Sequence, residues 1–261
     1  MSRPLQACYL GRFGTILRHV EPARAIVYTA IFGDYDTLKQ PPGQDMACNF
    51  VCFTDDAASL GPSGAWRVIE VRRDPDEHPR MQAKWFKLMS HRIFPGGRLT
   101  IRYDFLSVCR KRCDAVIWID GSIRIKSSSF VREFADHIGP SGWALFIHPD
   151  RDCIYDELVA SSAMPKYDGQ PMAEQVAHYR ALGHPEHSGL FACGVIARSG
   201  RNDPRLIMLN EAWWQEIRRW SHQDQLSLPY LLRKLHLGVD LVNHDLWRND
   251  WFDWVPHNSE A

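Results

Sequence analysis

Short apolar runs that end in polar or acidic residues alternate with helical patterns along this chain, and this alternation limits the folds open to it. The run AIVYTAI ends near Gly33, CNFVCFT is followed by Asp55, and AVIWI is followed by Asp120. Apolar runs of this kind are typical of strands buried on both faces of a parallel sheet. Their alternation with helices predicts right-handed crossover units, and therefore an α/β fold with a mostly parallel central sheet flanked by helices. Ligands of such sheets bind at the carboxyl ends of the strands, so we expect the acidic strand ends to meet at one crevice.

Hydrophobic periodicity predicts the order of these elements. We expect strands at 25–31, 48–56, 66–71, 115–120, 143–148 and 189–198, and helices at 80–94, 130–138, 172–182, 204–220 and 224–236. The segment 97–113 has no clear pattern. Because no repeat or linker interrupts the chain, we expect a single domain over residues 25–261, preceded by an N-terminal extension of residues 1–24.

The charge balance argues against a partner that is selected by a long-range electrostatic field. Lys plus Arg and Asp plus Glu each number 31, so the chain is not predicted to bind nucleic acid, and it allows at most peripheral membrane contact. An anionic ligand must then be held by local charges. The N-terminal sequence is basic but contains no secretory signal or membrane span, which predicts a cytoplasmic protein.

The seven cysteines are an odd number, and we interpret them as reduced thiols rather than as a disulfide framework. The pairs Cys48/Cys52 and Cys109/Cys113 have a spacing that a zinc site tolerates. However, Cys48 and Cys52 alternate along an expected strand, where small buried thiols are the favoured interpretation.

Asp120 is the first candidate for chemistry, because it follows a strongly apolar strand and precedes Gly121, which leaves room for a ligand close to the backbone. A carboxylate at this place suits Mg²⁺ or Mn²⁺, which are commonly bound by one or two carboxylates and the phosphates of a substrate. The alternative is an aspartate that caps the following turn.

A second candidate is the basic stripe Arg80, Lys84, Lys87 and His91 on one helix. Such a stripe is often a solvated helix face. If the N-terminus of the helix points into the crevice, Arg80 and Lys84 would instead meet a pyrophosphate, which arginine binds with a bidentate fork and lysine as a point charge.

The last third of the chain adds Asp224, histidines and many tryptophans. Asp224 follows Ser221 by three residues, which resembles a shortened capping box, but a carboxylate there could also orient a sugar hydroxyl or stabilise a cationic sugar. His244 or His257 could supply a late metal ligand. Aromatic faces suit sugar rings, although most of the tryptophans are expected to pack in the core or at its rim.

The succession of motifs resembles a known family. The segments YTAIFGDYD, CFTDD, PRMQAKWFKLMSHRIFP, WIDGSIRI, HPDRDCIYDE, GLFACGVIARS and SHQDQLSLPYLL, in this order, resemble a glycosyltransferase-like domain family whose plant members include mucilage- and turgor-related proteins and which also has bacterial members. That family is similar to nucleotide-sugar transferases with a GT-A (Rossmann-like) fold. The resemblance therefore implies a GT-A fold over most of the chain, about 25–234.

The resemblance also implies roles for individual residues. Ser122 stands where ordinary GT-A enzymes have the second aspartate of an Asp-X-Asp metal motif, so metal affinity depends on Asp120. On the nucleotide side, the implied positions are Tyr28, Thr29 and Ala30 along the nucleoside, Asp55 or Asp56 near the base, and Arg80, Lys84 and Lys87 at the phosphates. Asp120, Gly121 and Ser122 are implied at the metal and donor, and Gly194 at the donor sugar. His148, Arg151 and Glu157 are implied beside the sugar or acceptor, and Asp224 with Gln225 at the acceptor.

These observations predict a metal-assisted glycosyltransferase that moves a sugar from a nucleotide-diphosphate donor, expected to be UDP-linked, to a carbohydrate or other hydroxyl-bearing acceptor. Asp120 and Asp224 would be its catalytic carboxylates. One alternative is a non-catalytic protein that binds nucleotide sugars or carbohydrates. A metal-dependent hydrolase is a weaker alternative, because the chain has no Gly-X-Ser-X-Gly elbow and no His-Glu-X-X-His pair.

Overall fold

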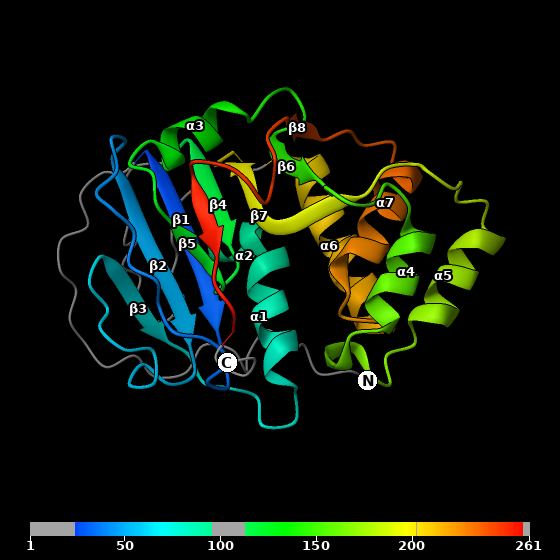
Figure 1. Cartoon of the computed structure of the whole chain (residues 1–261), viewed down its shortest axis with the longest axis horizontal. Coiled ribbons are helices and arrows are strands. Elements are labelled where there is room, and N and C mark those ends of the chain that lie inside the picture. Colours follow the sequence, from blue (N-terminus) through cyan, green and yellow to red (C-terminus); the bar gives the residue numbers. More distant parts are fainter. Residues whose placement is uncertain (1–23, 96–112, 202, 258–261) are drawn as a thin grey trace.

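The central sheet contains the strand order β3-β2-β1-β4-β7-β6-β8 (Figure 1). The computed structural model describes residues 24–95, 113–201 and 203–257. The strands of this sheet are β1 (Ala25–Ile31), β2 (Cys48–Thr54), β3 (Trp66–Glu70), β4 (Ala115–Ile119), β6 (Trp143–Ile147), β7 (Phe191–Ser199) and β8 (Asp240–Val242). A separate two-stranded sheet is formed by β5 (Ile123–Ile125) and β9 (Phe252–Trp254). The expected segment 97–113 and the extension before residue 24 lie almost wholly outside the described residues.

Helices connect and cover these strands. They are α1 (Pro79–Leu88), α2 (Ser90–Ile93), α3 (Phe130–Asp136), α4 (Ile154–Ser162), the 3₁₀ helix η3 (Pro165–Tyr167), α5 (Met172–Ala181), α6 (Pro204–Arg219) and α7 (Asp224–Lys234). None of the helices that the structure describes combines the length and apolar character required to cross a bilayer.

The sheet is mostly parallel, as the sequence predicts. β1 pairs in parallel with β2 and β4, β2 with β3, and β6 with β8, whereas β7 runs antiparallel to both of its neighbours. The carboxyl ends of β1, β4 and β6 therefore lie at the same edge of the sheet, next to the amino end of β7.

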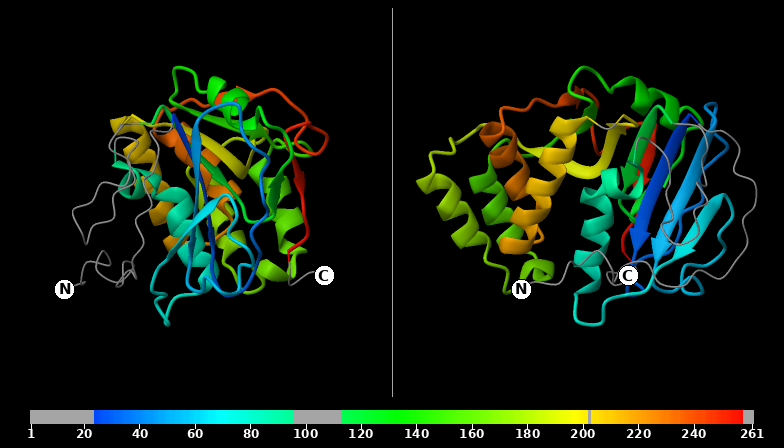
Figure 2. Two further views of the ribbon diagram at one scale, coloured as in Figure 1. Left: turned by 90° about the vertical axis from the view of Figure 1, so that its left-hand side faces the viewer. Right: turned by 180° about the vertical axis from the view of Figure 1, so that it is seen from behind.

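The core has two layers, because every residue of β1 is buried and successive side chains of a strand point to opposite faces. Tyr28 and its neighbours on one face pack with residues of α1, α6 and α7, and Val27 on the other face packs with α3 and β9. Figure 2 shows α1 between the strands and the α6–α7 pair, with α4 and α5 beyond them. The structure is therefore an α/β fold with helices on both faces of the sheet.

The structure also contains elements that the periodicity did not predict: α4, β5, β8 and β9. The helix expected at 80–94 is divided at Met89, whose backbone leaves the helical conformation (φ −92°, ψ 34°), and α2 follows it. This break places Leu88 and Met89, which are consecutive, fully inside the core.

Candidate active site

The described residues form a cavity of about 700 Å³ at the sheet edge where β1, β4 and β6 end. Ala30, Asp120 and His148 line it at or just beyond these strand ends, and Gly194 of β7 completes the floor. Its walls come from one face of α1, from the first turn of α7 and from the C-terminal segment, through Pro79, Arg80, Lys84, Lys87, Asp224, Gln225, Trp247, Trp254 and His257. The strand ends therefore converge as the sequence predicts.

Four charged side chains, here named the buried charge cluster, meet at the floor of this cavity: Lys84, Lys87, Asp120 and Asp224. Asp224 Oδ2 lies 2.6 Å from Lys84 Nζ and 2.8 Å from Lys87 Nζ, and Lys87 Nζ also lies 3.1 Å from Asp120 Oδ1. Asp120 Oδ1 accepts a second hydrogen bond, of 2.6 Å, from Trp118 Nε1. The ammonium of Lys87 thus bridges two carboxylates that are 104 positions apart, as the residue numbers 120 and 224 show.

Burial and charge set the protonation of this cluster. Burial would raise the pKa of the Asp224 carboxyl, but the charges of Lys84 and Lys87 outweigh it and hold that pKa well below its usual range. Burial alone would lower the pKa of Lys87, yet Asp120 and Asp224 raise it above its usual range. Burial lowers the pKa of Lys84, an effect that Asp224 opposes. A carboxylate as acidic as Asp224 is a poor general base, so the arrangement favours an electrostatic role for it.

The geometry of α1 explains why its lysines reach the cavity. Arg80, Lys84 and Lys87 follow one another at intervals of four and three residues, so they lie on one face of the helix, and the cavity lining contains all three. His91 does not belong to this face, because it follows the break at Met89 and pairs with Glu211 at 2.9 Å. The stripe is therefore not a solvated helix face.

Asp224 is the first residue of α7, but the capping box suggested by Ser221 does not form. Gln223 is the N-cap residue and makes no side-chain capping hydrogen bond, and the hydroxyl of Ser221 donates to Gln175 Oε1 at 2.6 Å. The carboxylate of Asp224 is consequently free to bind the two lysines.

A second buried network centres on Glu157 at the start of α4, where only 1% of the residue is exposed. Its carboxylate accepts hydrogen bonds from Arg151 Nε (2.6 Å), Ser161 Oγ (2.8 Å) and Gln223 Nε2 (2.8 Å). His148 Nε2 lies 3.8 Å from the same carboxylate. Glu157 therefore ties the loop after β6 to the start of α7 and fixes His148 and Arg151 at the cavity wall.

Several residues expected at the donor lie outside the cavity lining. Tyr28 is fully buried in the core layer of α1, where its ring contacts Phe94 and Trp118, and Thr29 points to the opposite, equally buried face of β1. The carboxylate of Asp55 accepts a hydrogen bond from the Gly33 amide at 3.0 Å and so supports the turn after β1. Of the expected nucleoside residues, only Ala30 reaches the cavity.

Ser122 and His244 are also displaced from their expected places. Ser122 is buried, and its carbonyl accepts a hydrogen bond from the Val255 amide instead of facing a ligand. The ring of His244 packs against His137 and Trp251 and is not part of the cavity lining, so the structure does not bring it together with Asp120.

His257, the other histidine considered, does line the cavity. Its Nδ1 lies 2.7 Å from Asp36 Oδ2, and Asp36 also pairs with Lys39 at 2.8 Å. A methyl group on Gly121 would lie 2.8 Å from Asp36 Oδ2, which places this pair beside the Asp120–Gly121 turn. Sequence reasoning missed Asp36; its only signal was its position in the loop after the first strand.

A divalent cation fits this site only if it arrives with a ligand. Asp120 belongs to no group of three or more potential metal ligands among the described residues, and one of its oxygens already faces Lys87. The cavity lining nevertheless balances five cations against five carboxylates, namely Arg80, Lys84, Lys87, Arg151 and Lys166 against Asp36, Asp120, Asp150, Glu157 and Asp224. A diphosphate would bring uncompensated negative charge, so Mg²⁺ or Mn²⁺ carried by it suits the remaining oxygen of Asp120.

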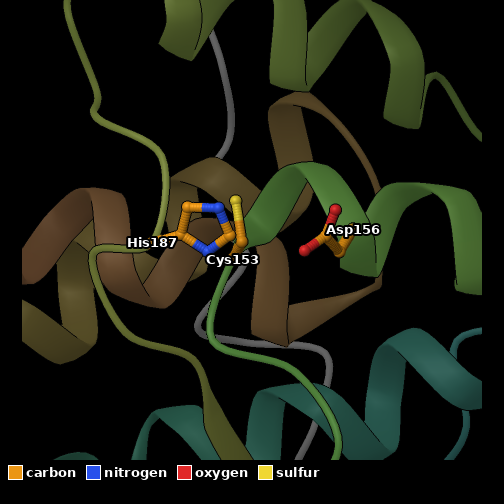
Figure 3. A group of neighbouring side chains, drawn as sticks. All are labelled: Cys153, Asp156 and His187. Carbon is orange, nitrogen blue, oxygen red and sulfur yellow. The ribbon is translucent and has the colours of Figure 1, made fainter.

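The group of potential metal ligands that the described residues do form lies elsewhere. Cys153, Asp156 and His187 offer ligand atoms within 4.8 Å of one another, and Figure 3 shows the thiol beside the imidazole with Asp156 farther along α4. Asp156 and His187 are exposed, and His187 Nδ1 pairs with Asp152 at 2.8 Å. None of these residues lines the cavity. Cys48 and Cys52 are not part of such a group, and burial raises the pKa of their thiols to about 11 and about 12.

Comparison with known proteins adds to this geometry. The family model described as TOD1/MUCI70, glycosyltransferase-like domain, matches residues 15–251. The chain is also similar to the "Probable hexosyltransferase MUCI70" of Arabidopsis thaliana, with 23% identity over 234 residues that cover 80% of this chain and 37% of that protein. The chain thus spans well under half the length of this relative. The family match includes the buried charge cluster, whereas Trp254 and His257 lie beyond it.

Proposed function

Because the chain belongs to the TOD1/MUCI70 glycosyltransferase-like domain family, we propose that it transfers a hexose from a nucleoside-diphosphate sugar to a hydroxyl group of an acceptor. Family membership and the α/β fold with its mostly parallel sheet agree with the GT-A resemblance seen in the motifs. A UDP-linked donor is part of the proposal. The observation that carries it is the buried charge cluster at the cavity floor, where two lysines and Asp120 meet.

The donor diphosphate would bind against Lys84 and Lys87. Both ammoniums line the cavity, and each ammonium has three N–H donors, so Lys87 can bind a phosphate oxygen while it remains paired with Asp120 and Asp224. Arg80, one turn earlier on α1, also lines the cavity and can add a bidentate contact. The diphosphate would thereby lie over the carboxyl end of β4.

Sugar transfer breaks the bond between the anomeric carbon and the diphosphate and forms a bond from that carbon to the acceptor oxygen, whose hydroxyl proton passes to an oxygen of the departing diphosphate. In the transition state, positive charge grows on the sugar while negative charge grows on the leaving group. Lys84, Lys87 and Arg80 would stabilise the leaving diphosphate electrostatically. Asp224, which stays ionised, would hold the two lysines in place and present negative charge near the cationic sugar. Asp120 would hold Mg²⁺ or Mn²⁺ bound to the diphosphate, and such an ion supplies further neutralisation of the leaving group.

Replacing Asp120 by asparagine tests the metal part of this proposal. Asp120→Asn keeps the shape of the side chain but removes its charge, so we expect donor hydrolysis and transfer to fall about 100- to 1000-fold. We also expect Mn²⁺ to strengthen UDP binding to the unaltered protein about tenfold or more by calorimetry, and to do so much less in the variant.

Asp114→Asn is the matched control, because Asp114 stands just before the other end of β4 and its exposed side chain pairs only with Arg24 among the described residues. Its activity should equal that of the unaltered protein. If chelation of divalent ions changes neither turnover nor UDP affinity, the lysines alone suffice and the metal part of the proposal is wrong. Absence of UDP or other nucleoside-diphosphate binding under all conditions would contradict the proposed function itself.

A further inference from the structure

We infer that Trp247, supported by Trp254, forms a stacking platform that binds a carbohydrate acceptor at the mouth of the cavity. This inference rests on the proposed function and adds a class of acceptor to it. Trp247 is 53% exposed and lines the cavity. Large aromatic side chains contribute strongly to binding, because they offer a rigid apolar face.

The loop around Trp247 is held in a defined conformation, although the indole is exposed. Asp245 Oδ1 accepts hydrogen bonds from the backbone amides of Trp247 (2.8 Å) and Arg248 (3.0 Å), and Asn249 Nδ2 donates to the carbonyls of Asp245 and Leu246. Leu246, only 3% exposed, anchors the same loop in the core. Because the backbone is already ordered, a ligand that stacks on Trp247 loses little free energy in ordering the loop.

A continuous row of residues joins Trp247 to the buried charge cluster. The Asp120 amide donates a hydrogen bond of 2.8 Å to the Gly194 carbonyl. The Trp254 indole lies directly on Gly194, where a methyl group would overlap the ring. The ring centres of Trp254 and Trp247 are 5.6 Å apart. A ligand that stacks on Trp247 therefore lies on the same side of Asp120 as β7.

The sheet order separates this platform from the nucleoside. β4 lies between β1 and β7, so Asp120 lies between the loop after β1, with Asp36, and the Gly194–Trp254 side. If the diphosphate binds over β4 with its nucleoside toward β1, its sugar points toward β7 and Trp254. The acceptor must approach the anomeric carbon from beyond that sugar, which is where Trp247 lies.

The chemistry of the platform suits a pyranose ring. The C–H groups on one face of a pyranose form an apolar surface that can pack on an indole, while the hydroxyls at its rim need hydrogen-bond partners. Trp254 Nε1 is buried and has no hydrogen-bond acceptor among the described residues, so the indole supports Trp247 by packing. Asp245 and Arg248, in the same turn as Trp247, are exposed polar residues.

The test compares Trp247→Ala, Trp247→Phe and the control Leu182→Ala, which changes a similarly exposed apolar residue (58%) outside the cavity lining. Each protein, saturated with UDP, is applied to an array of neutral α- and β-linked oligosaccharides. We expect the unaltered protein and Leu182→Ala to bind the same glycans, Trp247→Ala to lose about tenfold or more in affinity, and Trp247→Phe to retain most of it.

In transfer assays with the glycans that bind, the acceptor KM should be highest for Trp247→Ala and close to the unaltered value for Trp247→Phe and Leu182→Ala. The kcat should change much less. Affinity for UDP in the absence of acceptor should be equal in all four proteins. The inference is overturned if Trp247→Ala binds the glycans as well as the unaltered protein, if no neutral glycan binds, or if the substitution weakens UDP instead, which would assign the indole to the nucleoside. Failure of UDP binding in the unaltered protein would contradict the proposed function rather than the platform.

Discussion

Replacing Asp224 by asparagine is expected to lower the free energy of unfolding by about 3–5 kcal/mol, because it leaves a buried cation without its counter-charge. Lys84 pairs only with Asp224 among the described residues, at 2.6 Å, and their side chains are 16% and 5% exposed. Lys87 keeps Asp120 as a partner, so the unpaired charge falls mainly on Lys84. Urea denaturation followed by circular dichroism measures the change.

A charge-balanced double variant separates this explanation from a general loss of packing. Asp224→Asn combined with Lys84→Met removes both members of the closest pair and leaves Lys87 with Asp120. We expect the double variant to recover most of the lost stability, to within about 1–2 kcal/mol of the unaltered protein. Turnover should remain low in both variants. If the double variant is as unstable as Asp224→Asn alone, the pairing of Lys84 with Asp224 does not explain the effect.

Replacing Lys87 by methionine should reduce kcat/KM for the donor about 100- to 1000-fold. Lys87 provides the positive charge between Asp120 and Asp224, and preorganised charge at a leaving group contributes several kcal/mol in a site that excludes water. Methionine has a similar length and packs in the same space, but it cannot neutralise a diphosphate. Initial rates of donor hydrolysis measure the effect on turnover, and the affinity for UDP measures the effect on donor binding.

Lys234→Met is the control for Lys87→Met, since Lys234 lies in the last turn of α7, is exposed and does not line the cavity. It should leave kcat/KM unchanged. A thermal melt of Lys87→Met checks that the fold persists, because Asp120 and Asp224 then lack their shared cation. Unchanged donor kinetics in a folded Lys87→Met protein would contradict the role given to this lysine.

The sequence predicts much of the sheet, because each central strand is a continuous apolar run with a polar end. The expected strands at 25–31 and 66–71 and the helix at 172–182 agree with β1, β3 and α5 to within a residue. α4, with the sequence IYDELVASS, was missed, and weak separation of its apolar and polar faces does not explain this, since α5 separates them even less and was predicted. β5 and β9 were missed because three-residue strands give no usable alternation.

Individual site residues were predictable where chemistry is concentrated in a short segment. Arg80, Lys84 and Lys87 form a stripe on one helix, and Asp120 stands out after its strand. The pairing of Lys84 with Asp224 spans 140 positions, and that of Asp36 with His257 spans 221, so neither leaves a local pattern. Tyr28 and Thr29 are buried and lie outside the cavity lining, which Ala30 reaches, because an apolar strand does not reveal which of its last residues extends beyond the core.

The pairing of β9 with β5 has a consequence for the order in which the protein becomes functional. Trp254 is in register with Ile123, and His257 reaches Asp36 near the start of the chain. Strands β1 to β4 and α1 can all leave the ribosome before residues 252–257 exist. The ligand-binding hollow is therefore unfinished until residues 252–257 are synthesised, and a nascent chain shortened before residue 252 would lack one of its walls.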